Sequence, residues 1–290
     1  MKTIVIAGAS GFIGAHLSRH FESLGWKVKT IGRSRSNGTW DDQSSLIRTL
    51  EGSDAVVNLA GKSVNCRFTR SNVEELIRSR VETTAAIGEA IAHCKQPPAV
   101  WINASGASIY REHVSAANNE QSPTDGEGVM AEVARQWEAA FFESKLPTTR
   151  KVALRISLVL GEDGGVWPIL KRLAHFGLGG KQGSGKQMMS WIHIKDLCRM
   201  IEHVISNENI GGVLNAACPG SVSNREFMKV VRSSVDRKWG WPASVLEIKL
   251  GTALLGIPAE LILRGMWVRN EHKHMTDFSF HYGAPSSLQN

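Results

Sequence analysis

Residues 1–14 constrain the fold more strongly than any other stretch of this chain. An apolar segment rich in β-branched residues, Ile4 to Ala7, is followed by three glycines at three-residue intervals, Gly8, Gly11 and Gly14. The apolar run predicts a buried parallel strand. Glycines directly after such a strand allow a tight turn, a close approach of the backbone to a pyrophosphate, and packing of the next helix. The stretch therefore predicts a strand, a phosphate-binding turn and a helix that together bind a dinucleotide.

An amphipathic segment from Phe12 to Leu24 follows the glycines and predicts that helix. The free amides at its N-terminus would face the anion. The alternative is an ordinary strand-to-helix turn without a ligand, because glycine-rich turns are common. We favour the dinucleotide because the motif lies between a strand and a helix.

The first half of the chain alternates strand-like and helix-like segments. Further strands are expected at Lys27 to Ile31, Asp54 to Leu59, Ala99 to Asn103 and Lys151 to Ile156, and helices at Asn72 to Cys94 and Val129 to Glu143. This alternation predicts an α/β fold, a doubly wound parallel sheet of the Rossmann type. Such sheets bind ligands in the crevice beyond the carboxyl ends of their strands, so the loops after these strands are expected to form the site.

The character of the sequence changes after residue 160, toward glycine-rich turns, aromatic residues and irregular spacing. We therefore expect a dinucleotide-binding domain at residues 1–160 and a smaller substrate or cap lobe at residues 161–290. Residues from about 190 to 217 are expected to return to the first domain, with a strand at Val213 to Ala217. From Asn270 onward the tail has little apolar periodicity, and we expect it to be partly mobile.

The residues after the second strand, Gly32-Arg33-Ser34-Arg35, indicate which dinucleotide binds. An acidic residue at this place takes the ribose hydroxyls of NAD, whereas an arginine accommodates the 2′-phosphate of NADP. No acid is present, and Arg33 lies about twenty residues beyond the glycines, where the discriminating residue is expected. We therefore expect NADP(H), held by Arg33 with help from Ser34. The alternative is that Arg33 and Arg35 are solvated loop charges.

Composition narrows the classes of protein. The chain has 290 residues, 42% of them hydrophobic and 21% charged, which is ordinary for a globular protein. Its net charge of +7 is scattered, without a basic stripe interleaved with aromatic residues, so we expect no nucleic-acid partner. The four cysteines lie far apart and have no metal-binding spacing, which predicts no metal site. Neither a secretory signal nor a bilayer-spanning segment is recognisable, and we expect a cytoplasmic protein with no membrane partner.

The chain resembles the extended short-chain dehydrogenases/reductases in three motifs. They are Gly8-Ala-Ser-Gly-Phe-Ile-Gly14, Asp54-Ala-Val-Val-Asn-Leu-Ala-Gly61 and Asn103-Ala-Ser-Gly-Ala-Ser-Ile-Tyr110. More narrowly, it resembles the atypical "epimerase family" branch, marked here by Arg67-Phe-Thr69, Ser79-Arg80, Trp137-Glu138, Leu154-Arg155, Phe176-Gly-Leu-Gly-Gly180, Gly183-Ser-Gly-Lys-Gln187 and Ser190-Trp-Ile-His-Ile-Lys-Asp196. The resemblance implies an NADP-binding Rossmann fold with cofactor contacts from Gly8, Ser10, Gly11, Phe12, Ile13, Gly14, Leu59, Ala60, Gly61, Ser105 and Arg155.

Ordinary members of that family carry a Tyr-x-x-x-Lys pair that transfers the carbonyl proton beside the nicotinamide. Matching Glu138 to the glutamate after that pair places Met130 at the tyrosine and Ala134 at the lysine. Neither side chain can transfer a proton, so the usual reductase or 4-epimerase mechanism does not carry over. Gly106 falls at the usual catalytic serine or threonine, which leaves Ser105 and Ser108 as near substitutes.

Other polar residues are candidates for the chemistry. The candidate catalytic residues are Tyr110, Ser105 and His193, and the candidate substrate-binding residues are Arg67, Arg80 and Trp137. An imidazole titrates near neutrality, but the alternating neighbours of His193 also fit a structural histidine in a strand. Trp137 equally fits packing between lobes. Arg155 stays protonated and is expected to pack or pair below the nicotinamide rather than react.

One motif points elsewhere. Gly180-Lys-Gln-Gly-Ser-Gly-Lys186 matches the first seven positions of a nucleoside-triphosphate P-loop. Gln187 stands where the serine or threonine magnesium ligand belongs, and the next residues have an extended rather than a helical pattern. We therefore set phosphate-loop function aside.

Taken together, these features favour an NADP(H)-binding reductase or epimerase that acts on an unidentified small molecule with non-standard acid and base groups. The alternative is a non-catalytic protein that uses bound NADP(H) as a structural or redox-sensing ligand. A homodimer that forms through the long helices is compatible with either.

Overall fold

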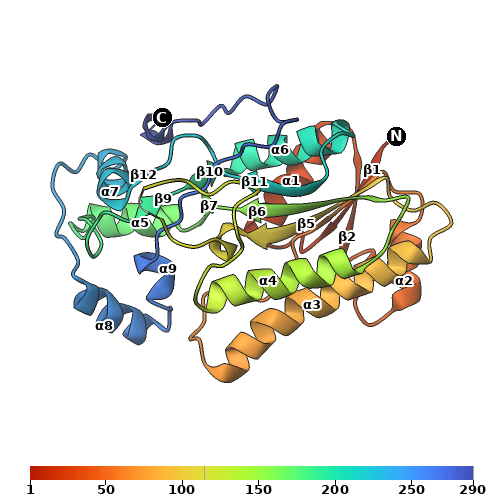
Figure 1. The fold of residues 1–290 in the computed structure, drawn as a ribbon, viewed down its shortest axis with the longest axis horizontal. Helices are drawn as coiled ribbons and strands as arrows, with labels where there is room; N and C mark the ends of the chain where they lie inside the picture. The colour runs from red at the N-terminus through yellow and green to blue at the C-terminus, as the bar shows by residue number, and fades with distance from the viewer. Residues whose placement is uncertain (114, 290) are drawn as a thin grey trace.

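The protein is built around one parallel sheet (Figure 1). A computed structural model describes residues 1–113 and 115–289. Its seven strands, in spatial order, are β11 (Gly212–Ala216), β6 (Arg150–Ile156), β5 (Val100–Gly106), β4 (Ala55–Asn58), β1 (Thr3–Ala7), β2 (Lys27–Gly32) and β3 (Gly38–Thr39). All neighbouring strands are parallel. The doubly wound sheet predicted from the sequence is confirmed, with the chain order reversing at β1.

Helices cover both faces of this sheet (Figure 1). On one face lie α1 (Phe12–Ser23) and α6 (Ile194–Ser206), and on the other α2 (Gln43–Leu50), α3 (Arg70–Ala92) and α4 (Val129–Glu143). Strand β1 alternates between the two cores: Ile4 and Ile6 join the α1 side, whereas Val5 and Ala7 join the α3 side. A central strand buried on both faces explains the unbroken apolar run at the start of the sequence.

The remaining elements form a smaller part beyond the carboxyl ends of the main strands. It contains a three-stranded sheet of β7 (Leu158–Gly161), β8 (Gly164–Gly165) and β10 (Trp191–His193), the pair β9 (Met188–Met189) and β12 (Val222–Ser223), and the helices α5 (Trp167–His175), α7 (Asn224–Ser233), α8 (Val245–Leu255) and α9 (Glu260–Leu263). Short 3-10 turns occupy Ala107–Ile109 and Pro285–Gln289. Trp167, Trp191 and Phe227 are almost fully buried in the core of this part.

After Ser190 the secondary structure differs from the one that the sequence pattern predicts. The alternating pattern of Trp191 to Lys195 predicts a strand throughout, but β10 ends at His193 and α6 begins at Ile194. His193 caps the helix, because its Nδ1 accepts a hydrogen bond from the backbone amide of Lys195 at 3.3 Å. A side chain that caps the first turn can start a helix even where the preceding residues alternate like a strand. The strand expected at Val213 to Ala217 is β11, which pairs with β6.

The C-terminal tail, which we expect from its sequence to be partly mobile, packs against the rest of the protein. Met275 is buried in the core on the α1 side, and Phe278 and Phe280 pack against it. The buried carboxylate of Asp196 accepts hydrogen bonds from the backbone amides of His281, at 3.1 Å, and Tyr282, at 2.7 Å. The tail thus continues across α6 toward α7 (Figure 1).

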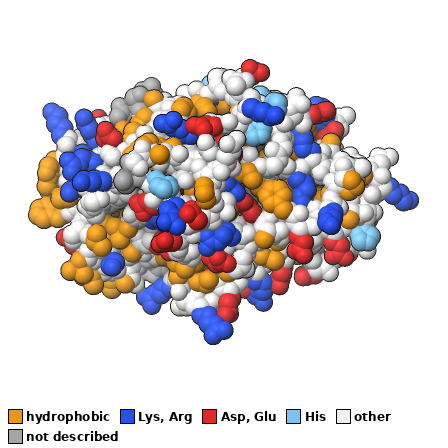
Figure 2. All heavy atoms as spheres, in the orientation of Figure 1, with side chains coloured by type: hydrophobic (Ala, Val, Ile, Leu, Met, Phe, Trp, Pro, Cys, Tyr) orange, Lys and Arg blue, Asp and Glu red, His pale blue; other side chains and the backbone are white. Residues whose placement is uncertain are grey.

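Charges of both signs are interspersed on the face that Figure 2 shows, rather than gathered in one basic stripe. In the described part of the chain, no helix combines the length and the apolar character needed to cross a membrane. Nor do the described residues bring together three His, Cys, Asp or Glu side chains in a way that would hold a metal ion.

Candidate active site

The glycine turn after β1 leaves no room for a side chain at its first and last glycines, Gly8 and Gly14. Gly8 has a φ of 81°, and a Cβ atom there would lie 2.9 Å from the carbonyl carbon of Leu59. At Gly14 a Cβ atom would overlap the carbonyl oxygen of Gly8. Helix α1 starts at this turn with Gly11 as its N-cap and no side chain capping it. The unpaired amides of a helix N-terminus favour an anion, so the turn fits the phosphates of a dinucleotide.

A cavity of about 450 Å³ opens beside this turn, over the carboxyl ends of the central strands. Of the residues expected to bind cofactor or substrate, it brings together Gly8, Gly11, Phe12, Ile13, Gly14, Leu59, Gly61, Arg80, Ser105 and Trp137. The other lining residues are Lys62, Ser63, Val64, Ala104, Gly106, Ser108, Met130, Val133, Ala134, Ile156, Ser157 and Val159. Ser10, Ala60 and Arg155 do not line it.

Arg33 and Ser34 lie outside this cavity, exposed, directly after β2. Strand β2 pairs with β1 in register, Ile31 opposite Ala7, and the amide of Gly8 donates to the carbonyl oxygen of Ile31 at 3.2 Å. The backbone just before Arg33 is therefore bonded to the glycine turn. This is the side of the turn on which a Rossmann fold binds the adenosine ribose.

Helix α4 presents apolar side chains to the cavity. Met130, Val133, Ala134 and Trp137 line it, and α4 contains neither tyrosine nor lysine. The two positions that the resemblance assigns to the proton-transferring pair therefore face the cavity with a thioether and a methyl group. Neither group can donate or accept a proton at neutral pH.

A buried polar network lies behind the cavity. The hydroxyl of Ser105 donates to Glu138 Oε1 at 2.7 Å, and Arg155 donates to both carboxylate oxygens of Glu138 at 2.8 and 2.7 Å. Arg155 also donates to the hydroxyl of Tyr110 at 2.7 Å, and that hydroxyl donates to Asn215 Oδ1 at 2.9 Å. All five residues are less than a tenth exposed. The Arg155–Glu138 ion pair connects β6 to α4, and the hydrogen bonds around it add β5 and β11.

Tyr110, a candidate catalytic residue, belongs to this network and does not line the cavity. Burial raises the pKa of its phenol, against the opposing effect of the Arg155 cation. A phenol that already holds two partners and is not in the cavity wall is not placed to give a proton to a substrate there. Burial acts against the charge of Arg155, but its bonds to Glu138 outweigh burial and raise its pKa.

His193 is likewise outside the cavity lining. Its ring stacks on that of Tyr282 with 3.7 Å between centroids, and its Nδ1 caps α6. Burial lowers its pKa to about 4, so the imidazole is neutral at physiological pH. These contacts are those of the structural alternative, and a catalytic role for His193 stays a prediction. Of the three candidate catalytic residues, the structure brings Ser105 alone to the cavity.

A second network supports the cavity wall and was missed from the sequence. Asn58 Nδ2 donates to Asn103 Oδ1 at 2.7 Å and to Thr84 Oγ1 at 3.1 Å, and Trp137 Nε1 donates to the same Thr84 hydroxyl at 3.0 Å. The signal was available, since Asn58 and Asn103 are polar residues inside apolar strands, where a side chain must find partners. Trp137 is therefore held with its ring fixed against the cavity.

The two arginines expected to bind substrate lie in different places. Arg80, from α3, lines the cavity, whereas Arg67 is exposed and donates to the carbonyl oxygen of Ala253 at 3.0 Å. Arg67 borders a second, more open cavity of about 410 Å³ with Phe68, Thr252, Ala253, Ile257 and Pro258. The P-loop-like segment runs into β9, which is extended as expected.

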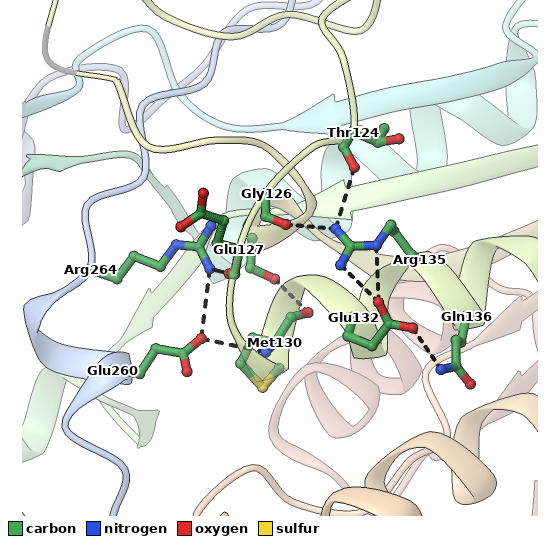
Figure 3. Close-up of polar contacts among 10 residues, drawn as sticks. Thr124, Gly126, Glu127, Met130, Glu132, Arg135, Gln136, Glu260 and Arg264 are labelled. Atoms are coloured by element: carbon green, nitrogen blue, oxygen red, sulfur yellow. Dashed lines mark hydrogen bonds and ion pairs between the residues drawn. The ribbon is translucent and has the colours of Figure 1, made fainter.

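The C-terminal part anchors the start of α4 (Figure 3). Gly128, the N-cap of α4, supplies no side chain, but Glu260 accepts a hydrogen bond from the amide of Met130 at 3.5 Å. Arg264 lies 3.7 Å from Glu260 and donates to the carbonyl oxygen of Glu127. The position of Met130 in the cavity wall is thus fixed from α9, more than a hundred residues away in the chain.

Comparison with known proteins agrees with this geometry. The family described as "NAD dependent epimerase/dehydratase family" matches residues 4–217. The chain belongs to this family. It therefore has the NAD(P)-binding fold of the extended short-chain dehydrogenases/reductases, as the sequence motifs predicted.

Relatives within the epimerase family extend the match along the chain. Epimerase family protein SDR39U1 of Homo sapiens is 34% identical over 242 residues, which are 81% of each chain. Epimerase family protein YfhF of Bacillus subtilis is 28% identical over 288 residues, 96% of this chain and 94% of its own. The crystal structure of human SDR39U1 with NADPH superposes with a TM-score of 0.89 at 30% identity, covering 99% of this chain and 98% of that one.

Proposed function

We propose that this protein binds NADP(H) and acts as an oxidoreductase or epimerase on a small molecule in the cavity. The observation that carries the cofactor part is Arg33, an exposed arginine directly after β2, beside the glycine turn and without an acidic neighbour in Gly32-Arg33-Ser34-Arg35. An arginine there accommodates a 2′-phosphate. The crystal structure of human SDR39U1 with NADPH supports the same proposal.

The residues present fit the cofactor. The glycine turn and the N-terminal amides of α1 would hold the pyrophosphate, and Arg33 with Ser34 would hold the 2′-phosphate. When bound, the nicotinamide supplies or accepts a hydride. Around a bound nicotinamide, the apolar side chains of Phe12, Met130 and Val133 would exclude water from the reacting groups.

Hydroxyl groups are the proton-carrying side chains best placed in this cavity. Ser105, Ser108 and Ser157 line it. Ser157 donates to the carbonyl oxygen of Ala216 at 2.7 Å and Ser108 to that of Met130 at 3.1 Å. We assign to Ser105 and Ser108 the task of holding the substrate oxygen, because they take the places nearest to the serine that Gly106 replaces. To donate to the substrate, each hydroxyl would have to turn from its present acceptor, Glu138 for Ser105 and the carbonyl oxygen of Met130 for Ser108.

Selective cofactor binding tests the proposal. We expect NADPH to bind at least about tenfold more tightly than NADH, and Arg33→Ala to remove most of that difference, because one charge-assisted contact to phosphate is lost. The measurement is fluorescence titration of both cofactors. The control is Arg78→Gln, which removes an exposed arginine on α3 that pairs with Glu75. Equal affinities of the unmodified protein for NADPH and NADH would refute the proposal.

A second candidate function rests on α4. Because Met130 and Ala134 cannot transfer a proton, a protein that binds NADP(H) as a redox-sensing ligand, without turnover, is also consistent with this wall. The discriminating experiment incubates the protein with NADPH and a panel of carbonyl compounds and nucleotide sugars, following absorbance and product stereochemistry. Turnover that falls in Ser105→Ala and Ser108→Ala supports the enzyme. Tight NADPH binding with no turnover across the panel supports the sensor.

A further inference from the structure

The charged groups of the main cavity all have the same sign. Among the described residues that line it are two cations, Lys62 and Arg80, and no aspartate or glutamate. The ammonium of Lys62 donates to the neutral amide oxygen of Asn72 at 2.7 Å. The cavity wall on the α3 side is therefore cationic without a carboxylate of its own.

Arg80 is the more buried of the two. It is 8% exposed, and its guanidinium donates to two backbone carbonyl oxygens, those of Leu76 at 2.8 Å and Lys62 at 3.1 Å. Burial lowers its pKa to about 10, against an opposing effect of Cys66, which leaves it charged at neutral pH, and no carboxylate of the described residues forms an ion pair with it. Two hydrogen bonds use two of its five N–H groups, so donors remain for a ligand.

The surroundings of Arg80 hold it in place at the cavity. Its guanidinium lies over the ring of Trp137, 5.0 Å from the centroid, and that ring is itself fixed by Thr84. Gly61 makes room, since a Cβ atom there would lie 2.9 Å from Arg80 Cζ. Two backbone hydrogen bonds and the neighbouring ring restrain this guanidinium, and a restrained planar guanidinium suits bidentate contact with an oxyanion.

The contrast with Arg155 shows that the chain does compensate a buried guanidinium elsewhere. Arg155 is 4% exposed and is paired with the carboxylate of Glu138. A buried cation without such a partner is destabilising to the fold. At Arg80 that destabilisation is offset if an anion joins the site.

We propose that Arg80, assisted by Lys62, binds an oxyanion of the substrate, so that the substrate is an anionic compound carrying a carboxylate or a phosphate. The inference rests on the proposed function in that the cofactor takes the glycine-turn end of the same cavity. Arg80 and Trp137 come from α3 and α4, on the face of the sheet opposite α1. The pyrophosphate already has the turn and the α1 amides as donors, which leaves Arg80 for the substrate.

The test measures anion binding to the NADPH-loaded protein by calorimetry, with oxalate as the carboxylate probe, inorganic phosphate as the phosphate probe and acetamide as the neutral probe. We expect one of the two anions to bind and acetamide not to bind. Arg80→Gln weakens the anion about tenfold or more, and Lys62→Gln about threefold. Arg78→Gln, two residues away on the exposed side of α3, leaves the affinity unchanged. The anion that binds better identifies the group.

Three results would overturn the proposal. The first is that neither anion binds to the unmodified protein. The second is that Arg80→Gln binds the anion as tightly as the unmodified protein does. The third is that Arg80→Gln retains anion binding but loses NADPH affinity, which would make Arg80 a cofactor ligand. If Arg80→Gln does not fold, Arg80→Lys and Lys62→Gln decide by the same titrations. Failure of the proposed function is seen separately, as weak or unselective NADPH binding, and the anion titration can then be repeated without cofactor.

Discussion

Gly14 shows at the scale of one residue how closely the turn and α1 are packed. A methyl group there would overlap the Gly8 carbonyl oxygen, so Gly14→Ala must push α1 away from the turn. We expect a loss of about 1–3 kcal/mol in the free energy of unfolding and at least about tenfold weaker NADPH binding. Denaturant unfolding and fluorescence titration measure the two effects.

The matched control is Gly251→Ala in α8, where an added Cβ atom meets nothing within 4 Å. Alanine in place of glycine inside a helix is expected to stabilise by about 0.5–1 kcal/mol. NADPH affinity unaffected by Gly14→Ala would show that the close approach at the turn is not what binds the cofactor.

Glu138 and Glu132, two glutamates of α4, test what burial does to an ion pair. Glu138→Gln leaves the buried Arg155 without its counter-charge, and we expect a loss of about 3–5 kcal/mol in the free energy of unfolding. Glu132→Gln removes the partner of Arg135, a pair about 35% and 46% exposed, and should cost about 1 kcal/mol or less. Similar losses for both variants, measured by denaturant unfolding, would contradict the role given to the buried network.

At the scale of elements, helix α6 has an N-cap that titrates. Burial holds the pKa of His193 at about 4, below the value of 6.5 for a free imidazole. The unfolded chain therefore binds a proton that the folded one does not, and the contribution of His193 to stability, present above about pH 6.5, is lost as the pH falls toward 4. Asp196 favours the protonated form, whereas Lys195 opposes it.

His193→Asn separates capping from titration, because asparagine also caps helices. We expect a change of about 1 kcal/mol or less at pH 7.5, mainly from the lost stacking on Tyr282. Between pH 6.5 and 4 the variant should lose stability less steeply than the unmodified protein. Parallel slopes in thermal unfolding across this range would show that His193 is not buried as a neutral group.

Elements with strong periodicity were predictable from the sequence, and short ones were not. The bounds of α4 agree with the expected helix at both ends, and β1 and α1 agree to within about a residue, because apolar spacing and glycine punctuation decide them. Strand β3 has two residues and α2 has eight, too few for a periodic signal to stand out. At α6 a cap determined the boundary, which alternation does not show.

The candidate site, too, was predictable from the sequence only in part. The glycine turn and the α4 wall follow from local sequence and from the resemblance. Tyr110 does not, because its hydroxyl is bound by Asn215, a partner 105 residues away that no spacing rule connects to it. Lys62 was not predicted from the sequence, because it lies in a loop without a motif. Its importance follows from the absence of aspartate and glutamate among the described residues that line the cavity.

At the scale of the whole molecule, the C-terminal tail connects the core of the main sheet with the core of the smaller part. The tail passes from Met275, in the core on the α1 side of the main sheet, to Leu288, in the core of the smaller part around Trp167. Its midpoint is fixed by Asp196, which is fully buried and accepts hydrogen bonds from Arg199 and from the amides of His281 and Tyr282. One carboxylate therefore holds the segment that bridges the two cores.

Asp196→Ala is expected to release that segment. Three donors lose their acceptor, so we expect a loss of about 2–4 kcal/mol in the free energy of unfolding. Tryptic cleavage after Lys273, followed by mass spectrometry of the native protein, should become about tenfold faster, since local opening of the tail exposes the site. Asp277→Ala, at an exposed position of the same tail, is the control and should change neither quantity. If cleavage after Lys273 is equally slow in Asp196→Ala, apolar packing of Phe278 and Phe280, and not this carboxylate, is what holds the two cores together.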